Sequence, residues 1–242
     1  MTSARTLAGQ RVVVIGGTSG IGRAVAEAAL ADGAEVVVAS SNPANVETAA
    51  ARLGAGARGM AVDVKNEASI AAFFEALGRL DHLVFTAGDW GPHLMPGPIE
   101  SIDIAAVQAG LAVRFWGALL AVKHAKPRLP ANGSVTLTSG VLVHRPPKGQ
   151  PLIAAFGGAV EHLARGLAVD LAPIRVNAVC PGLVLTETWA QASAEAIGQM
   201  SGRTLLQRAA NLDEAVEAYL YAMRGGYTTG QVLMVDAGAM LA

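Results

Sequence analysis

Short runs of β-branched and aliphatic residues alternate with longer Ala- and Leu-rich segments along the whole chain. Several short runs are continuously apolar, which is typical of strands covered on both faces in a parallel sheet. The expected strands are Arg11–Ile15, Glu35–Ala39, Arg58–Val62, His82–Thr86, Ser134–Thr138, Arg175–Val179 and Gln231–Val235. The expected helices are Ile21–Ala31, Asn45–Leu53, Ala68–Leu77, Ile102–Pro127, Ile153–Leu171, Glu187–Gly198 and Leu212–Met223.

This alternation predicts βαβ units in an α/β fold, with a right-handed, doubly wound parallel sheet and helices on both faces. No internal repeat, low-complexity tract or Pro/Ser-rich linker divides the 242 residues. We therefore expect a single domain over residues 1–242. Asn66 and Asp213 precede helical patterns, so we expect them to be helix N-caps.

Charge and cysteine content limit the classes of partner. The 18 Lys and Arg residues balance 19 Asp and Glu residues, so we expect no nucleic-acid partner. No run of about 18 apolar residues is present, so we expect no membrane span. No basic and apolar leader is visible, which favours a cytoplasmic protein. The single cysteine, Cys180, excludes a disulfide framework and a cysteine-based zinc site; we expect a buried structural thiol and no metal.

A glycine-rich loop, Gly16-Gly17-Thr18-Ser19-Gly20-Ile21-Gly22, follows the first expected strand, and a helix follows the loop. In such a unit, the first glycine permits a tight turn, the second lets the backbone approach a diphosphate, and the third lets the helix pack on the strand. The N–H groups at the helix start then face the phosphates. We therefore expect a dinucleotide-binding Rossmann domain. The cofactor-binding residues of this loop are predicted to be Gly16, Thr18, Ser19, Gly20, Ile21 and Gly22.

The Gly-x-x-x-Gly-x-Gly spacing resembles that of the short-chain dehydrogenase/reductase family, and motifs along nearly the whole chain extend the resemblance. Thr86-Ala87-Gly88 stands where the family has an Asn-Asn-Ala-Gly turn. The run 175–186 matches the family's sixth strand and its Pro-Gly-x-x-x-Thr loop, whose Thr bonds the nicotinamide amide. The resemblance implies a seven-stranded sheet of order 3-2-1-4-5-6-7. It also implies cofactor contacts from Asp63, Val64, Ala87, Gly88, Pro181, Gly182 and Thr186.

The end of the second strand bears on the choice between NAD(H) and NADP(H). An acidic residue there would bind the ribose 2′-hydroxyl and repel a 2′-phosphate. Ser40, Ser41 and Asn42 offer hydroxyls and an amide instead, although no Arg stands at the usual phosphate-reading position. We therefore predict that NADP(H) is preferred over NAD(H), with these three residues beside the ribose.

All four residues that carry the family's chemistry are replaced. The family uses an Asn, a Ser, a Tyr as general acid/base, and a Lys that lowers the pKa of the Tyr. By resemblance, these positions fall on Arg114, Gly140, Ile153 and Gly157, and Ser139 takes the first place of the family's Ser-Ser pair. No Tyr occurs between residue 1 and residue 219, so a shift of register does not restore the acid.

Two functions are open at this point. In the first, the protein is an NADP(H)-dependent oxidoreductase that acts on a carbonyl/alcohol or similar small molecule in an apolar pocket, with another proton donor or with water as the source. His144 is the best acid because an unperturbed His titrates near pH 6.5. The weaker candidates around the pocket are Arg145, Lys148, Asp89 and His93. In the second, the protein binds the cofactor without turnover and acts as a sensor or an interaction protein.

Arg114 interrupts an apolar helix, where an unpaired charge would be costly to bury. Because Gly157 lacks the volume and the cation of the family's Lys, we expect Arg114 to reach into that space and bond the nicotinamide ribose or a substrate anion. Arg can position charge but cannot deliver a proton; the alternative is an Arg at an oligomer interface. The predicted catalytic residues are thus Arg114, His144 and Ser139. The resemblance also implies a homodimer or homotetramer.

Overall fold

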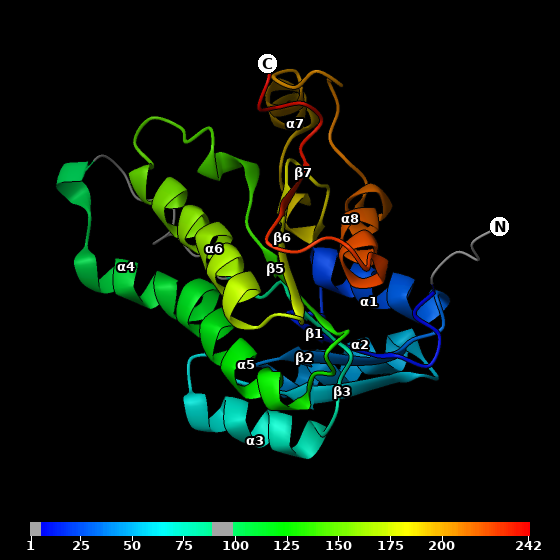
Figure 1. Cartoon of the computed structure of the whole chain (residues 1–242). Coiled ribbons are helices and arrows are strands. Elements are labelled where there is room, and N and C mark those ends of the chain that lie inside the picture. Colours follow the sequence, from blue (N-terminus) through cyan, green and yellow to red (C-terminus); the bar gives the residue numbers. More distant parts are fainter. Residues whose placement is uncertain (1–5, 89–98) are drawn as a thin grey trace.

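The computed structural model of the protein describes residues 6–88 and 99–242, except for the side chain of residue 106. Seven parallel strands form one sheet in the order β3-β2-β1-β4-β5-β6-β7, as the resemblance implies (Figure 1). The strands are β1 Arg11–Ile15, β2 Glu35–Ser40, β3 Ala57–Ala61, β4 His82–Phe85, β5 Ser134–Thr138, β6 Arg175–Pro181 and β7 Val232–Val235. The predicted α/β fold and strand order are confirmed.

Helices cover both faces of the sheet (Figure 1). Their bounds are α1 Gly20–Ala31, α2 Pro43–Leu53, α3 Glu67–Leu77, α4 Ile104–Leu111, α5 Ala118–Ala125, α6 Pro151–Asp170, α7 Ala194–Ser201 and α8 Leu212–Arg224. Helices α3, α5 and α6 pack on one face, and α1, α2 and α8 on the other. Strand β1 shows why both faces of the sheet are apolar. Its residues Val13 and Ile15 are buried under α3, α5 and α6, whereas Val12 and Val14 are buried under α1, α2 and α8 on the other face.

The long helix predicted over 102–127 is interrupted. Between α4 and α5 lies a π-helix, η3 (Ala112–Gly117), and a 3₁₀ turn, η4 (Lys126–Arg128), ends the segment. A π-helix adds a residue to the turn and therefore changes the direction of the side chains that follow; such segments are frequent at functional sites. Periodicity predicted the helix but not this change of pitch.

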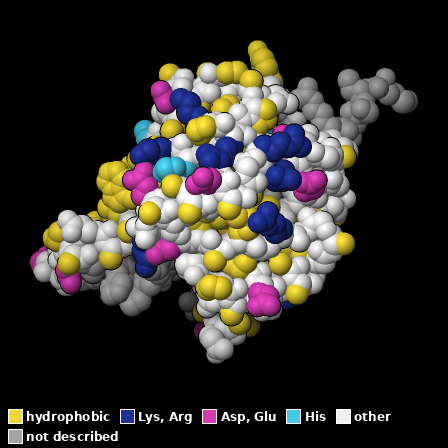
Figure 2. Space-filling model, turned by 90° about the horizontal axis from the view of Figure 1, so that it is seen from below, with side chains coloured by type: hydrophobic (Ala, Val, Ile, Leu, Met, Phe, Trp, Pro, Cys, Tyr) yellow, Lys and Arg dark blue, Asp and Glu magenta, His cyan; other side chains and the backbone are white. Residues whose placement is uncertain are grey.

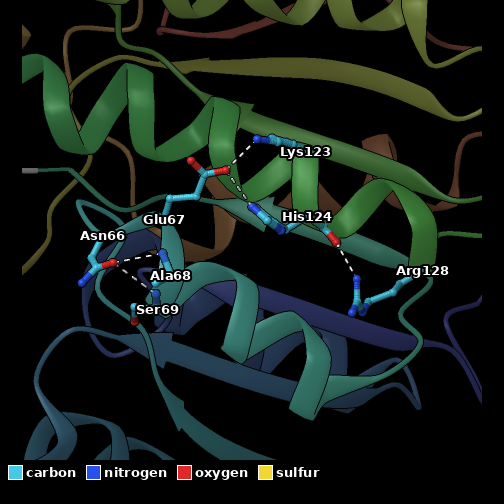
Figure 3. Close-up of polar contacts among 7 residues, drawn as sticks. All are labelled: Asn66, Glu67, Ala68, Ser69, Lys123, His124 and Arg128. Atoms are coloured by element: carbon cyan, nitrogen blue, oxygen red, sulfur yellow. Dashed lines mark hydrogen bonds and ion pairs between the residues drawn. The ribbon is translucent and has the colours of Figure 1, made fainter.

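Two helix starts differ in how far the sequence predicted them. Asn66 caps α3 as expected, because its Oδ1 accepts hydrogen bonds from the N–H groups of Ala68 and Ser69 (Figure 3). The prediction for Asp213 was wrong. The N-cap of α8 is Asn211, which forms a capping box with Glu214, and Asp213 lies in the first helical turn. A reciprocal pair of hydrogen bonds satisfies two backbone N–H groups at once.

Helices α3 and α5 are linked at their surface. Glu67 Oε1 accepts from Lys123 Nζ at 2.6 Å and lies 3.1 Å from His124 Nε2 (Figure 3). These contacts hold the pKa of Glu67 below its usual value, with the Lys123 hydrogen bond as the largest cause. The pair connects the helix after β3 to the helix that follows the π-helix.

In the described part of the chain, α6 is the one helix that is long and apolar enough to cross a membrane, judged by length and composition only. It nevertheless packs on β5 and β6 as a core helix of the sheet. Elsewhere, Lys and Arg side chains are interspersed with Asp and Glu side chains on the face shown in Figure 2.

Candidate active site

The glycine-rich loop turns at the carboxyl end of β1 and leads into α1. Gly16 has φ +93°, and a Cβ on it would lie 2.5 Å from the backbone nitrogen of Ala87, at the end of β4. A Cβ on Gly22 would lie 2.2 Å from the Gly16 carbonyl oxygen. Only glycine fits these two positions, so the loop is packed against Ala87 as a cofactor-binding loop requires.

The other predicted cofactor contacts lie on loops at the same edge of the sheet. Ser19 is the N-cap residue of α1, and its side chain makes no capping hydrogen bond. Asn42, by contrast, caps α2 through Oδ1, which accepts from the N–H groups of Ala44 and Asn45. Ser40 ends β2, and Ser41 lies between it and this cap. A carboxyl edge where the strand order reverses, here between β1 and β4, is where doubly wound sheets bind ligands.

Two further loops reach the same edge. Asp63 follows β3, and its Oδ1 accepts from the Lys65 N–H at 3.0 Å. Val64 packs against the end of the π-helix, since a Cβ on Gly117 would lie 3.0 Å from the Val64 Cβ. Pro181 ends β6, and the Gly182 N–H donates to the Val235 carbonyl at 2.8 Å. Each of these predicted contacts thus has a defined place in the structure.

A carboxylate ties the loop after β6 to the start of α1. Glu187 accepts from the Gly20 N–H at 3.0 Å and from Arg23 Nη2 at 2.6 Å. A Cβ on Gly20 would lie 3.6 Å from Thr186 Cγ2, so this contact also seats Thr186 on the loop. Hydrogen bonds from its own N–H and from Gly20, together with Arg23 and Arg52, lower the pKa of Glu187. Motif matching assigned Thr186 but overlooked Glu187, and its position next to Thr186 was the available signal.

The Glu187→Gln variant is expected to weaken NADPH binding several-fold. The amide loses the charged hydrogen bonds to Gly20 and Arg23, each worth about 1.5–3 kcal/mol gross, so Thr186 loses its support. Fluorescence titration measures the effect. Glu195→Gln on α7 is the matched control and should bind as the unmodified protein does; equal Kd values for both variants would contradict the role of Glu187.

Arg114 lies in the π-helix, and its guanidinium group lies against Gly88, just after β4. A Cβ on Gly88 would be 2.2 Å from Arg114 Nη2 and 2.7 Å from Cζ. Gly88 therefore makes the room in which the guanidinium rests, beside the Ala87 backbone that contacts the glycine-rich loop. The change of pitch in the π-helix and the glycine together place this cation at the carboxyl edge of the sheet.

The expectation that Arg114 fills the space at Gly157 was wrong. The three atoms nearest to a Cβ placed on Gly157 all belong to Val143, with Cγ2 at 1.9 Å. Val143 ends a 3₁₀ turn, η5 (Val141–Val143), which packs directly on α6. The turn after β5, rather than Arg114, is thus the nearest neighbour of a Cβ at Gly157.

Three polar side chains converge behind this turn. Ser139 Oγ donates to Glu161 Oε1 at 2.8 Å, and His144 Nε2 lies 3.0 Å from the same oxygen. Glu161 is 2% exposed, whereas the His144 side chain is 29% exposed. Two predicted catalytic residues, Ser139 and His144, are therefore brought together by a carboxylate that the sequence analysis missed. Its signal was an acid beside Val160, on the apolar face of α6.

Cys180 lies next to this group. The ligand atoms of His144, Glu161 and Cys180 are within 4.8 Å of one another. Burial, opposed by a hydrogen bond from Ser139 and supported by the nearby Glu161, raises the pKa of the Cys180 thiol to about 12. The thiol is thus buried and protonated at neutral pH, as expected of a structural cysteine.

The other candidates for the proton donor do not share the contacts of His144. Arg145 donates to the backbone carbonyls of Ala239 and Ala242, so it holds the C-terminal segment. Lys148 is exposed. Asp89 and His93 lie outside the described residues.

Tyr219 does not replace the family's tyrosine. It is a residue of α8 and is fully buried, and its hydroxyl lies 3.0 Å from Thr138 Oγ1. Burial raises its pKa above the usual value. A substrate cannot reach a hydroxyl enclosed in the core, so this tyrosine has a packing role.

Comparison with known proteins places this geometry in a family. Residues 15–240 match the family described as Enoyl-(Acyl carrier protein) reductase. The short-chain dehydrogenase/reductase ucsE of Acremonium sp is 38% identical over 254 residues, which cover 96% of this chain and 95% of that protein. The chain belongs to the short-chain dehydrogenase/reductase family. The resemblance drawn from the glycine-rich loop is confirmed, and with it membership of a family of NAD(P)(H)-dependent oxidoreductases.

Two solved structures of family members are similar throughout. One is MalC Reductase/Diels-Alderase from Malbranchea aurantiaca, at 32% identity and a TM-score of 0.91, covering 99% of this chain and all of that chain. The other is a small-chain dehydrogenase in complex with NADPH, at 34% identity and a TM-score of 0.80, covering 96% of this chain and 99% of that chain. A family member with this strand order therefore binds NADPH.

Proposed function

We propose that this family member is an NADP(H)-dependent reductase of a carbonyl or another polar double bond in a small molecule. The observation that carries the proposal is the Arg114 guanidinium against Gly88, beside the loop that Gly16 and Gly22 pack on Ala87. These groups lie at the switch point where doubly wound folds bind dinucleotides. The reductase direction is supported by the names of the matching family and of MalC.

The residues present fit NADP(H). The N–H of Gly20, the first residue of α1, is bonded to Glu187, so the N–H groups that follow it in α1 and the Ser19 hydroxyl would face the diphosphate. Ser40, Ser41 and Asn42 would lie beside the ribose without an acid to repel a 2′-phosphate, and Thr186 would hold the nicotinamide amide. When bound, the reduced cofactor supplies a hydride. The chain's own part is to position the substrate, exclude water and deliver a proton.

Arg114 would hold the cofactor or a substrate anion by charge. Its guanidinium stays protonated, so it can stabilise negative charge but cannot be the proton donor. Gly140 leaves room for a Cβ where the family has its catalytic Ser, since among the described residues such a Cβ would meet the Pro181 carbonyl oxygen alone, at 3.9 Å. A side chain would therefore fit at this position at the end of β5, where the apolar substrate would lie.

Titration of intrinsic fluorescence tests the proposal. NADPH is expected to bind at least about tenfold more tightly than NADH, a difference of about 1.4 kcal/mol. Absorbance of the reduced nicotinamide with a panel of aldehydes and ketones then measures turnover. NADPH binding without turnover of any compound would favour a cofactor-binding protein without catalysis, and no binding would remove both functions.

The Arg114→Met variant is expected to raise the Kd for NADPH by roughly tenfold, because a charged hydrogen bond contributes about 1.5–3 kcal/mol. The same titration measures the change. Lys123→Met on α5 removes an exposed cation from the neighbouring helix and serves as the control. An unchanged Kd for Arg114→Met would show that Arg114 does not bind the cofactor, and would leave it only the role of binding a substrate anion.

We also infer that the protein is a homo-oligomer in the cytoplasm. Ile104, Trp116 and Val169 are exposed by 64%, 52% and 82% on the segment around the π-helix and on α6, and apolar exposure of this kind is typical of an interface. Light scattering after gel filtration tests the oligomeric state; a monomer at micromolar concentration would contradict it.

A further inference from the structure

We propose that Glu161 and His144 form a proton-delivery pair that takes the place of the missing tyrosine, with Glu161 as the positioning residue and His144 as the acid. The inference rests on the proposed function, since it names the proton source for that reduction. It follows from the burial, the hydrogen bonds and the charges around one carboxylate, and from the packing that brings His144 to it.

Glu161 is buried in a way that requires compensation. A carboxylate with 2% exposure loses its hydration, and an ionised group in such a place must be paired and hydrogen-bonded. Ser139 supplies a neutral hydroxyl at 2.8 Å. Among the described residues, His144 is the basic side chain that forms an ion pair with Glu161. The carboxylate is therefore balanced when the imidazole is protonated, and the pair then holds one transferable proton.

The orientation of His144 suits a donor. Nε2 lies 3.0 Å from the buried Glu161 oxygen, while no hydrogen bond of Nδ1 is found among the described residues. A carboxylate on one ring nitrogen fixes the ring and its tautomer, and leaves the other N–H free to serve a substrate. The side chain is 29% exposed, so solvent reaches the ring and can replace a spent proton.

The glycine at the family's lysine position makes this contact possible. Val143 sits on α6 where a side chain on Gly157 would stand, and a Cβ there would come within 1.9 Å of Val143 Cγ2. His144 follows Val143 directly, and Glu161 lies one helical turn beyond Gly157 on α6. The close approach of the turn therefore brings the imidazole onto the carboxylate.

The step balances. The carbonyl carbon of the substrate receives the hydride, the π electron pair of the C=O bond moves to oxygen, and that oxygen takes the proton from His144 Nδ1. The products are an alcohol, oxidised cofactor and a neutral imidazole beside an ionised Glu161. A proton from solvent then restores the imidazolium, so one hydride and one proton are consumed in each turnover.

A spectroscopic experiment tests the pair without a substrate. In proton NMR of the full chain, an imidazole N–H bonded to a carboxylate should give a resonance far downfield of the amides. We expect this resonance in the unmodified protein and in His162→Gln, whose histidine is exposed and bonded to the Gly158 carbonyl. It should disappear in Glu161→Gln and in His144→Gln. A resonance that is lost in His144→Gln but survives in Glu161→Gln would overturn the pair, whereas one from His124 beside Glu67 would persist in both variants.

A kinetic experiment tests proton delivery. Glu161→Gln keeps the shape and a carbonyl acceptor but loses the charge, so kcat should fall by about 100-fold, the usual contribution of a general acid, while the Kd for NADPH stays unchanged. The kcat of His144→Ala should fall by a similar factor. Added 4-methylimidazole should restore part of the activity of this variant. A purely structural role for His144 predicts no such rescue. His162→Gln should keep the unmodified rate.

The outcomes distinguish this inference from the proposed function. If the unmodified protein reduces a carbonyl and Glu161→Gln does so equally fast, the pair is wrong and the reductase stands. If the unmodified protein reduces no carbonyl, the proposed function falls and the assignment of the proton source falls with it. Loss of activity on treatment with EDTA would assign His144, Glu161 and Cys180 to a metal ion, and would also overturn proton delivery.

Discussion

Gly157→Ala is expected to destabilise the protein, although alanine is the better helix former. A Cβ at this position would lie 1.9 Å from Val143 Cγ2 and 3.3 Å from Val143 Cβ. Because the valine side chain is branched and stiff, the whole turn Val141–Val143 has to move. Overpacking of this kind costs about 1–3 kcal/mol, which exceeds the gain of up to about 1 kcal/mol in helix propensity.

Gly158→Ala is the matched control in the next position of the same helix. Its Cβ would lie 3.8 Å from Val143 Cγ1, an ordinary contact. This variant should therefore gain the helix propensity without the clash and become more stable, by up to about 1 kcal/mol. Urea unfolding measures the free energy of unfolding of both. Equal stabilities for the two variants would show that the turn does not depend on Gly157.

A double-mutant cycle locates the cause. Removing the valine methyls in Val143→Ala should relieve much of the clash, so the effects of Gly157→Ala and Val143→Ala should be strongly non-additive. Gly157→Ala should also lower kcat in the reductase assay, because displacement of the turn withdraws His144 from Glu161. Additive losses would instead place the strain elsewhere on α6.

Gly140 and Gly157, the two glycines at positions where the resemblance implies catalytic side chains, thus have different surroundings. The sequence alone could not show this difference. For a Cβ on Gly140, the nearest atom in the described part of the chain is the Pro181 carbonyl oxygen at 3.9 Å, so a Ser would fit there. Gly157 is filled from the opposite side by Val143. Both positions looked like erased catalytic side chains in the sequence. Gly140 has room for a side chain, whereas Gly157 is a packing contact that builds part of the site.

The fold and the cofactor loop were predictable because they depend on local patterns. Alternating apolar runs predict a parallel sheet, and Gly16 and Gly22 belong to a spacing that is recognised within one strand–loop–helix unit, although their close contacts also involve Thr86 and Ala87 after β4. The contacts of Glu161 and Glu187 were not predictable, because each joins elements far apart in the chain: Glu187 bonds Gly20, and Glu161 bonds Ser139 and His144. The π-helix that carries Arg114 also lacks a sequence signature.

The burial of His82 makes it a source of acid sensitivity. It begins β4 and is 3% exposed. Its Nε2 donates to Gln10 Oε1, and Nδ1 lies 2.7 Å from Ser134 Oγ, from which it can accept. The neutral ring is thus satisfied at both nitrogens. Burial first, and then the charge of Arg175, lower the pKa of His82 to about 4, against an opposing effect of Asp81.

The sign of the pH effect follows from this shift. The unfolded chain binds a proton at His82 near the model-peptide pKa of 6.5, whereas the folded protein binds it only near pH 4. Between these values the unfolded state holds more protons, so acid favours unfolding. Above pH 6.5 the stability is fully present, and it falls as the pH drops towards 4. The total loss is about 3 kcal/mol, from about 1.4 kcal/mol for each pH unit of the shift.

Urea unfolding at pH 7 and at pH 4.5 checks the effect. The unmodified protein should lose about 2–3 kcal/mol more between these two pH values than His82→Gln does, because the amide cannot titrate. Carboxylates such as Glu67 and Glu187 titrate in both proteins, so their contributions cancel in the comparison. His162→Gln, which removes an exposed histidine, should lose as much as the unmodified protein. The same loss in His82→Gln would show that His82 accepts its proton in the folded state, and that the Ser134 hydroxyl turns to receive a bond from the charged ring.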